Sequence, residues 1–229
     1  MATPRGRVLT GVVTGLVAAL VMAACAPSGQ QYVKNSSEGL YFKIPTDWEL
    51  YDEDAILDFQ EDELSPLEVE ETREGGWQVF FDAAPSPTLN HLGELVTKHP
   101  NGQAQIIQLG PEARDTVSMG RLRNLIFPID EVSDFDSSLV ELVDGKEIHE
   151  EGVRGVQFVF NIDARVPALI QTGTLEPGDR RFATFNQTAL VDERTETLYV
   201  LLVSCSVRCY EDNKGTIDDV VESWTVKDR

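Results

Sequence analysis

The sequence concentrates carboxylates in one stretch, and carboxylates can bind hard cations or attract a basic partner. Between Tyr51 and Glu71 there are ten acidic residues and no lysine or arginine. Hard cations such as Ca²⁺ take carboxylate oxygens, but no glycine shapes a tight coordinating loop in this stretch. A solvated acidic surface is the alternative interpretation, because charged runs usually lie in water. The carboxylates that we single out for partner binding are Glu61, Asp62, Glu63, Glu70 and Glu71.

Histidines and short motifs give little support for an enzyme. The imidazole bases are His91, His99 and His149, all in segments that we expect at the surface. The chain has no phosphate-binding glycine loop, no G-x-S-x-G elbow, no H-E-x-x-H motif and no EF-hand spacing. We therefore predict no catalytic residue, no metal and no cofactor, and favour a binding or assembly module. The alternative is a cell-envelope enzyme, a hydrolase, whose active site no motif reveals.

The first 24 residues have the layout of a secretory signal peptide. Arg5 and Arg7 form a positive start, and an uncharged, mostly apolar stretch follows. Residues 20–25 read Leu-Val-Met-Ala-Ala-Cys, which resembles the bacterial lipobox, although the lipobox usually has leucine where this chain has Met22. The resemblance implies that residues 1–24 are a signal peptide that is removed and that Cys25 carries acyl chains such as palmitate. Several acyl chains give stable anchoring, so we expect a lipoprotein on the extracytoplasmic face of the cell membrane.

The other two cysteines, Cys205 and Cys209, form an even pair in a compartment that we expect to be oxidising. An even remainder of cysteines in an exported chain normally means a disulfide. Two thiolates with no nearby histidine fall short of the four ligands of a zinc site. On a straight strand their Cα atoms would lie about 13 Å apart, which a disulfide cannot bridge. We therefore predict a Cys205–Cys209 disulfide, a turn between the two residues, and a strand that ends near Cys205.

Net charge limits the partners of this protein. The formal net charge is −20 at pH 7, which repels nucleic acid and anionic membrane surfaces. We therefore expect membrane contact only through the lipid anchor, no nucleic acid, and a basic protein or another envelope component as the partner. The lipobox resemblance implies that the region 25–38 begins with a lipidated cysteine, and its composition predicts a flexible tether. The remaining length predicts a single α+β domain at 39–229.

Apolar periodicity predicts the elements of that domain. Alternating patterns and apolar runs predict strands at 40–44, 77–81, 104–109, 139–148, 152–162, 184–191 and 197–204. The last of these is apolar on both faces, so its sheet needs a covering layer on each side. Thr88, Ser118 and a capping box at Thr216 predict helix starts, and the acidic segment 130–136 reads as a loop. The long connection 164–181 is a candidate rim of a binding site.

Both ends of the predicted domain carry a familiar arrangement. Residues 40–48 read Leu-Tyr-Phe-Lys-Ile-Pro-Thr-Asp-Trp, and a long hairpin and a helix lead to Ser-Trp-Thr-Val at 223–226. This arrangement resembles the PsbP-like α/β/α sandwich, whose members include actinobacterial lipoproteins and the photosystem II extrinsic protein. The resemblance implies a mainly antiparallel sheet covered by helices on both faces, an exported location, and roles in binding and assembly. Because fold does not determine function, the partner stays open, and we expect recognition by the acidic surface together with the 164–181 connection.

Overall fold

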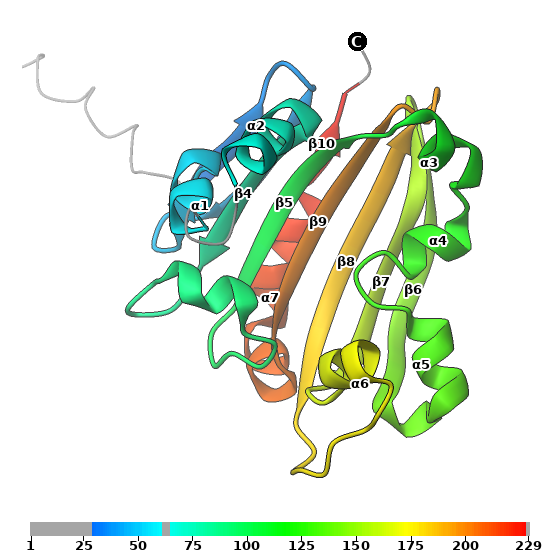
Figure 1. Ribbon diagram of the computed structural model, residues 1–229. Helices are drawn as coiled ribbons and strands as arrows, with labels where there is room; N and C mark the ends of the chain where they lie inside the picture. The colour runs from blue at the N-terminus through cyan, green and yellow to red at the C-terminus, as the bar shows by residue number, and fades with distance from the viewer. Residues whose placement is uncertain (1–28, 61–64, 228–229) are drawn as a thin grey trace, which may run out of the picture.

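A seven-stranded antiparallel sheet forms the middle layer of the computed structural model, which describes residues 29–60 and 65–227 (Figure 1). The strand order is β3-β4-β5-β9-β8-β7-β6, and each neighbouring pair is antiparallel. The strands are β3 (Glu49–Tyr51), β4 (Gly76–Asp82), β5 (Asn101–Gln108), β6 (Val140–Glu150), β7 (Val153–Asp163), β8 (Phe182–Asp192) and β9 (Thr197–Ser206).

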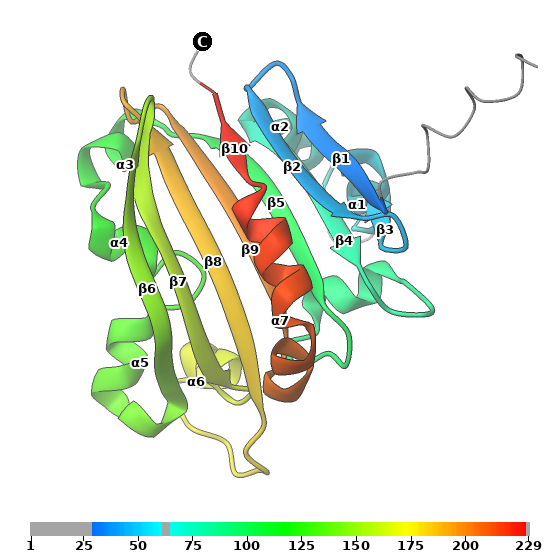
Figure 2. The same cartoon turned by 180° about the vertical axis from the view of Figure 1, so that it is seen from behind.

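One face of this sheet is covered by helix α7 (Val207–Glu222) and by a small second sheet (Figure 2). The small sheet has the order β1-β2-β10 and is antiparallel, with Thr225 opposite Tyr41. Its strands are β1 (Gln30–Asn35), β2 (Leu40–Pro45) and β10 (Thr225–Val226). The apolar side of β2 packs inward, and the ring of Phe42 lies 6.0 Å from that of Phe81 and 5.3 Å from that of Trp224, between ring centroids.

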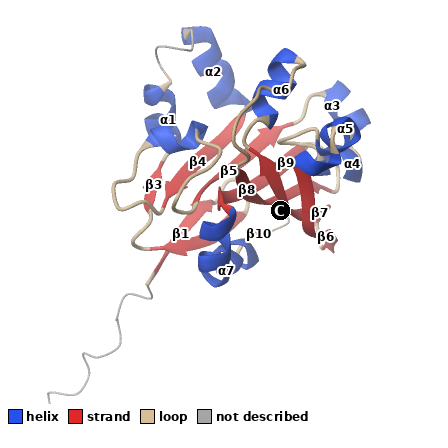
Figure 3. Cartoon of the chain, turned by 90° about the horizontal axis from the view of Figure 1, so that it is seen from below, coloured by secondary structure: helices blue, strands red, loops and turns tan. Residues whose placement is uncertain are grey.

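The opposite face is covered by short helices, which Figure 3 shows on the side of the sheet away from α7. They are α1 (Glu53–Phe59), α2 (Pro66–Gly75), α3 (Pro111–Thr116), α4 (Met119–Arg123), α5 (Ile129–Phe135) and α6 (Val166–Thr172), with 3₁₀ turns η1 (Leu89–Gly93) and η2 (Ser137–Leu139). The predicted α+β sandwich, an antiparallel sheet with helices on both faces, is confirmed. None of the helices in the described ranges combines the length and apolar character needed to cross a bilayer.

Strand β9 lies at the centre of the sheet and is buried along nearly its whole length. Leu198, Val200 and Leu202 pack on the side of the short helices, whereas Leu201 and Val203 pack on the side of α7. This confirms the prediction from the two apolar faces of the segment. Burial of both faces removes a large apolar area from water, so β9 contributes to the cores of both layers.

Three segments that were predicted to be irregular form regular structure. Strand β1 lies within the predicted tether 25–38. Val33 is its one fully buried side chain, but its backbone forms a strand because it pairs with β2. The predicted loop 130–136 is helix α5, whose Ile129 and Val132 are buried three residues apart. The 164–181 connection contains α6, which ends at Gly173 in the left-handed conformation.

Two predicted helix boundaries were also wrong. Helix α7 begins at Val207 and is capped by Ser206, so the capping box predicted at Thr216 lies inside the helix. Thr88 does cap a turn, but that turn is the short η1 and ends before Val96. Ser118 caps α4 as predicted, since its hydroxyl accepts a hydrogen bond from the Arg121 N–H at 3.2 Å.

Candidate functional site

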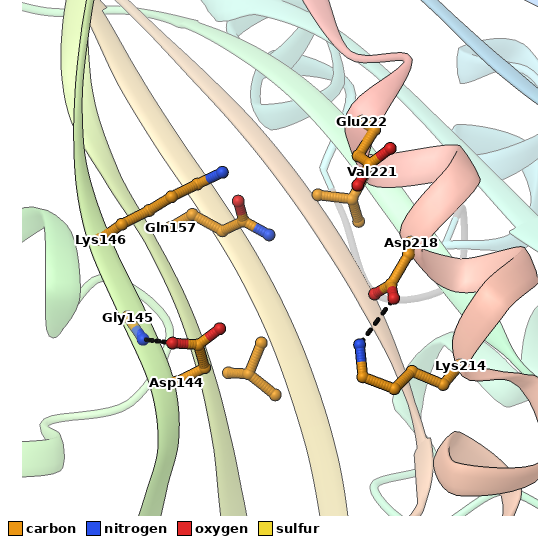
Figure 4. A pocket seen from close by; sticks show the side chains of 9 residues that line it. Asp144, Gly145, Lys146, Gln157, Lys214, Asp218, Val221 and Glu222 are labelled. Atoms are coloured by element: carbon orange, nitrogen blue, oxygen red, sulfur yellow. Dashed lines mark hydrogen bonds and ion pairs between the residues drawn. The ribbon is translucent and has the colours of Figure 1, made fainter.

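A polar depression lies on the α7 side of the large sheet, between α7 and the edge formed by β6 and β7 (Figure 4). Its volume is about 190 Å³. We call it the polar trough and define it by nine lining residues: Asp144, Gly145, Lys146, Gln157, Val159, Lys214, Asp218, Val221 and Glu222. Polar groups dominate both walls, which distinguishes the trough from the apolar cores on either side of β9.

A bulge in β6 decides which side chains reach the trough. The register of β6 against β7 shifts between Leu142 and Asp144. Because strand side chains alternate, an unbroken strand would place Glu141 and Asp144 on opposite faces. The extra residue, Val143, instead brings Glu141, Asp144 and Lys146 to the same face. The bulge therefore builds the outer wall of the trough and leaves the side chains of Leu142 and Val143 largely exposed.

The floor beside the trough is fixed by hydrogen bonds between side-chain amides. Gln157 Nε2 donates to Asn186 Oδ1 at 3.1 Å, and Asn186 Nδ2 donates to the Tyr210 hydroxyl oxygen at 3.0 Å. This line of contacts crosses from β7 over β8 to α7. Burial raises the pKa of Tyr210, so its phenol is neutral at physiological pH. Paired amides of this kind hold their polar groups in place without a ligand.

A second line of hydrogen bonds runs nearer the end of β7. Thr184 Oγ1 donates to Asn161 Oδ1 at 2.7 Å, and Asn161 Nδ2 donates to Glu141 Oε2 at 3.0 Å. These contacts join β8, β7 and β6 on the trough side of the sheet. Beside the apolar contacts of α7 with β9, the part of this face formed by β6, β7 and β8 is therefore polar and held in place by hydrogen bonds.

The walls carry more negative than positive charge. Lys214 and Asp218 form an ion pair on successive turns of α7, with Nζ 2.6 Å from Oδ2. The hydrogen bond to Asp218 raises the pKa of Lys214. Neither Lys146 nor Glu222 forms an ion pair with any residue in the described ranges. With Asp144, the lining has three carboxylates and two ammonium groups.

The inner wall of the trough is tied covalently to the central strand. The predicted Cys205–Cys209 disulfide is present, with the two Cα atoms 5.9 Å apart. Cys205 lies in β9 and Cys209 in the first turn of α7, so the predicted turn is the start of the helix itself. Ser206 caps that turn because its hydroxyl accepts from the Cys209 N–H at 3.4 Å. Together these contacts fix the direction in which α7 leaves the sheet.

Among the carboxylates predicted for partner binding, only Glu70 has a described side chain, and it does not line the trough. Cys25, Glu61, Asp62, Glu63 and the side chain of Glu71 lie outside the part of the chain that the structure describes. Glu70 is exposed on α2, which packs near β4 on the opposite face of the sheet. Burial raises the pKa of Glu53 at the start of α1. The carboxylates that face the trough come from β6 and α7, which the sequence did not single out.

The 164–181 connection also lies away from the trough. Its helix α6 covers the face opposite α7, and Figure 1 shows α2 and α6 at opposite ends of that face. Arg180, in the same connection, donates to Ser138 Oγ at 2.7 Å. Helix α2, which carries Glu70 of the acidic stretch, is therefore not next to α6 (Figure 1).

The histidines occupy two kinds of environment. His149 and His99 are exposed, and His149 Nε2 lies 3.4 Å from Glu147 Oε2. His91 Nδ1 lies 2.7 Å from Oδ2 of Asp82, which is 1% exposed. Asp82 also accepts hydrogen bonds from the backbone N–H groups of Ala84 and Thr88. This geometry fixes the turn after β4, and within the described ranges no hydroxyl or thiol contacts the other ring nitrogen of His91.

Metal ligands do not gather at any of these places. Within residues 29–60 and 65–227 there is no group of three or more histidine, cysteine or acidic side chains arranged to hold a metal ion. What the trough can do chemically is to hydrogen-bond, through amides and carboxylates, to a polar molecule that enters it.

Comparison with known proteins yields structural neighbours only. No family model matches the chain, and no curated protein does so. The solution structure of cyanobacterial PsbP from Synechocystis is similar, with 17% identity, a TM-score of 0.44, and coverage of 90% of this chain and 99% of that chain. The Ran-binding protein Mog1p of Saccharomyces cerevisiae has 9% identity and a TM-score of 0.44, covering 86% and 95%. A Pseudomonas aeruginosa protein of unknown function has 8% identity and a TM-score of 0.38.

Proposed function

We propose that this protein is a lipid-anchored binding module on the extracytoplasmic face of the cell membrane, and that it holds a basic, extended segment of a partner protein in the polar trough. The observation that carries the proposal is the line of paired amides from Gln157 through Asn186 to Tyr210, lying beside walls with excess carboxylate. The anchor in this proposal is Cys25, on the strength of the lipobox resemblance.

The chemistry of the trough matches that of an extended basic peptide. Peptide N–H and C=O groups pair well with side-chain amides such as that of Gln157, which lines the trough. Lysine or arginine side chains are attracted to Asp144 and Glu222 on the two walls. Because hydrogen bonds already fix the amides, less side-chain freedom is lost on binding. The net charge of −20 speeds the encounter with a basic partner.

The test removes the carboxylates of the trough. A synthetic Lys-Thr-Lys-Thr-Lys-Thr-Lys peptide is titrated against the wild type and against a variant with Asp144→Asn, Asp218→Asn and Glu222→Gln. We expect the Kd to rise about tenfold, since each exposed ion pair contributes about 0.5 kcal/mol. The affinity should also fall as NaCl is raised, because surface charges are screened over about 8 Å at physiological ionic strength.

A charge-matched control separates the trough from the general acidity of the protein. Glu211, Asp212 and Asp219 are exposed on the same helix and lie outside the trough. Their combined replacement by the corresponding amides changes the net charge by the same amount. Peptide binding should then stay near the wild-type value. An equal loss in both variants, or binding that does not respond to salt, would contradict the proposal.

A further inference from the structure

A second cavity lies on the opposite face of the sheet, the face of the short helices. It is a cleft of about 270 Å³ between η1 with its following loop on one side and the α4–α5 connection with α6 on the other. Leu92 and Leu95 line the first side, and Ile126 and Pro167 line the second. We call it the apolar cleft. Its volume is close to the lower end of the range typical of small-molecule sites.

Aromatic rings make up much of the wall. Phe127 and Phe185 line the cleft and pack edge to face, with centroids 5.2 Å apart. Phe185 also stacks on Phe160 at 5.6 Å. Phe80 closes the other end of the floor. A further ring that packs against such a cluster edge to face or in an offset stack adds a favourable interaction energy, so the cleft suits an aromatic ligand.

The floor carries three neutral polar side chains, Asn101, Gln103 and Ser204. Ser204 is 5% exposed, and its hydroxyl reaches Asn101 Oδ1 only at 3.4 Å, longer than an ordinary hydroxyl hydrogen bond. The half-buried Gln103 amide has no hydrogen-bond partner within the described part of the chain. A ligand hydroxyl could therefore donate to and accept from these groups.

Charge in the cleft disfavours an anion. Glu94, in the loop after η1, is the one ionisable side chain among its described lining residues. A carboxylate or phosphate on the ligand would lose its hydration and gain no cationic partner. The polar group of the ligand is therefore not an anion. Glu94 is exposed and solvated at the rim, so the buried floor offers no partner to a cation either and suits a neutral group.

We propose that the apolar cleft binds a small, neutral aromatic molecule that carries one hydroxyl group. The rings of Phe80, Phe127 and Phe185 hold the aromatic body, and Gln103 and Ser204 bind the hydroxyl. The site lies on the other face of the sheet from the polar trough and does not depend on the function proposed above.

The test compares three probes of nearly equal size on the full-length wild-type chain. Benzyl alcohol has the ring and a neutral hydroxyl, toluene lacks the hydroxyl, and benzoate replaces it with a charge. In ¹H–¹⁵N spectra, benzyl alcohol should shift the backbone amides of Gly102 and Gln103. Its Kd should be about fivefold lower than that of toluene, as expected for one net hydrogen bond, and benzoate should bind more weakly than both.

Two glutamines on neighbouring positions of the same strand face provide matched variants. Gln103 lines the apolar cleft, whereas Gln105 lies two residues further along β5 and lines a different depression next to Trp77. Gln103→Leu should raise the Kd for benzyl alcohol to about that of toluene, and toluene should bind at least as well as before. Gln105→Leu should change neither Kd.

Several results would overturn the proposal. These are shifts centred away from the cleft, equal affinities of the wild type for benzyl alcohol and toluene, tighter binding of benzoate, or the same loss in both glutamine variants. The comparison of probes on the wild type requires no substitution, so it decides the question even if Gln103→Leu fails to fold.

Discussion

Among single residues, Asp163 illustrates how a buried charge can position an element. Its side chain is inaccessible to solvent at the end of β7. Asp163 Oδ1 accepts hydrogen bonds from the backbone N–H of Arg165 at 3.0 Å and from its Nε at 2.9 Å, and Oδ2 accepts from Nη2 at 2.8 Å. The hydrogen bonds from the Arg165 side chain hold the pKa of Asp163 below its usual range. Arg165 immediately precedes α6, so this pair fixes where the helix begins.

Replacing Asp163→Asn should lower the free energy of unfolding at pH 7 by about 1 to 2 kcal/mol, because the charged, bidentate contact with Arg165 is lost. The loss is limited to this size because Arg165 is partly exposed and its guanidinium can still be hydrated. The sign of the pH dependence follows from the lowered pKa. The unfolded chain binds more protons than the folded one, so the stabilisation is complete above about pH 4 and is lost as pH falls through the folded value. Urea unfolding between pH 7 and pH 2.5 measures it.

The exposed Asp134 provides the control for this prediction. Asp134→Asn should leave the unfolding curve of the wild type almost unchanged at every pH. Below pH 4 the wild type should lose stability more steeply than Asp163→Asn. If the free energy of unfolding of the wild type and of Asp163→Asn changed with pH in parallel, the Asp163 charge would not contribute to folding.

Among the elements, α7 depends most directly on a covalent link. The Cys205–Cys209 disulfide closes a loop with a sequence separation of 4. On the loop-closure estimate, so short a loop stabilises the folded state by about 2 kcal/mol. Reduction with dithiothreitol should therefore lower the urea midpoint of a Cys25→Ser chain, in which no other thiol can respond. An unchanged midpoint would show that Ser206 and the packing of α7 suffice without the bond.

How well each element could be predicted depended on whether its signal was local. The long strands β7, β8 and β9 were predicted correctly, because each repeats a pattern over eight or more residues. Burial of one face gives an alternation of polar and apolar residues, and burial of both faces gives a continuous apolar run, as in β9. Helix α7 was placed too late, because Gly215 and the Thr216 box suggest a start, whereas tertiary packing continues the helix through both. Strand β1 was missed because its partner β2, and not its own composition, stabilises it.

The polar trough could not have been read from the sequence in the same way. The bulge at Val143 breaks the alternation of β6, so strict period two assigns Glu141 and Asp144 to opposite faces. The amide line joins residues from three elements, and only the tertiary fold brings Gln157, Asn186 and Tyr210 together. Composition instead drew attention to the acidic stretch, because charge density is visible without knowing which residues share a face.

For the whole molecule, the prediction concerns where the domain is held. A net charge of −20 disfavours attraction to an anionic bilayer, so we predict that a lipid on Cys25 is the attachment. Cys25→Ser should move the protein out of the membrane fraction and abolish labelling by an alkyne analogue of palmitate. Ser28→Ala, three residues away, should change neither result. If the Cys25→Ser protein stays in the membrane fraction and is processed at the same site, the lipobox interpretation is wrong.

The pairing of β10 with β2 has a consequence for the time course of folding. Lys43 N–H donates to Ser223 Oγ at 2.8 Å across a sequence separation of 180 residues, and Val226 lies opposite Leu40. Chains begin to fold from the N-terminal end while they are being made. The hairpin of β1 and β2 therefore lacks its third strand, β10, until nearly the whole domain has emerged. Until then, the apolar side of β2 is exposed. Strand β2, in the first hairpin to appear, is thus covered only by one of the last strands, and chaperones have long access to its apolar side.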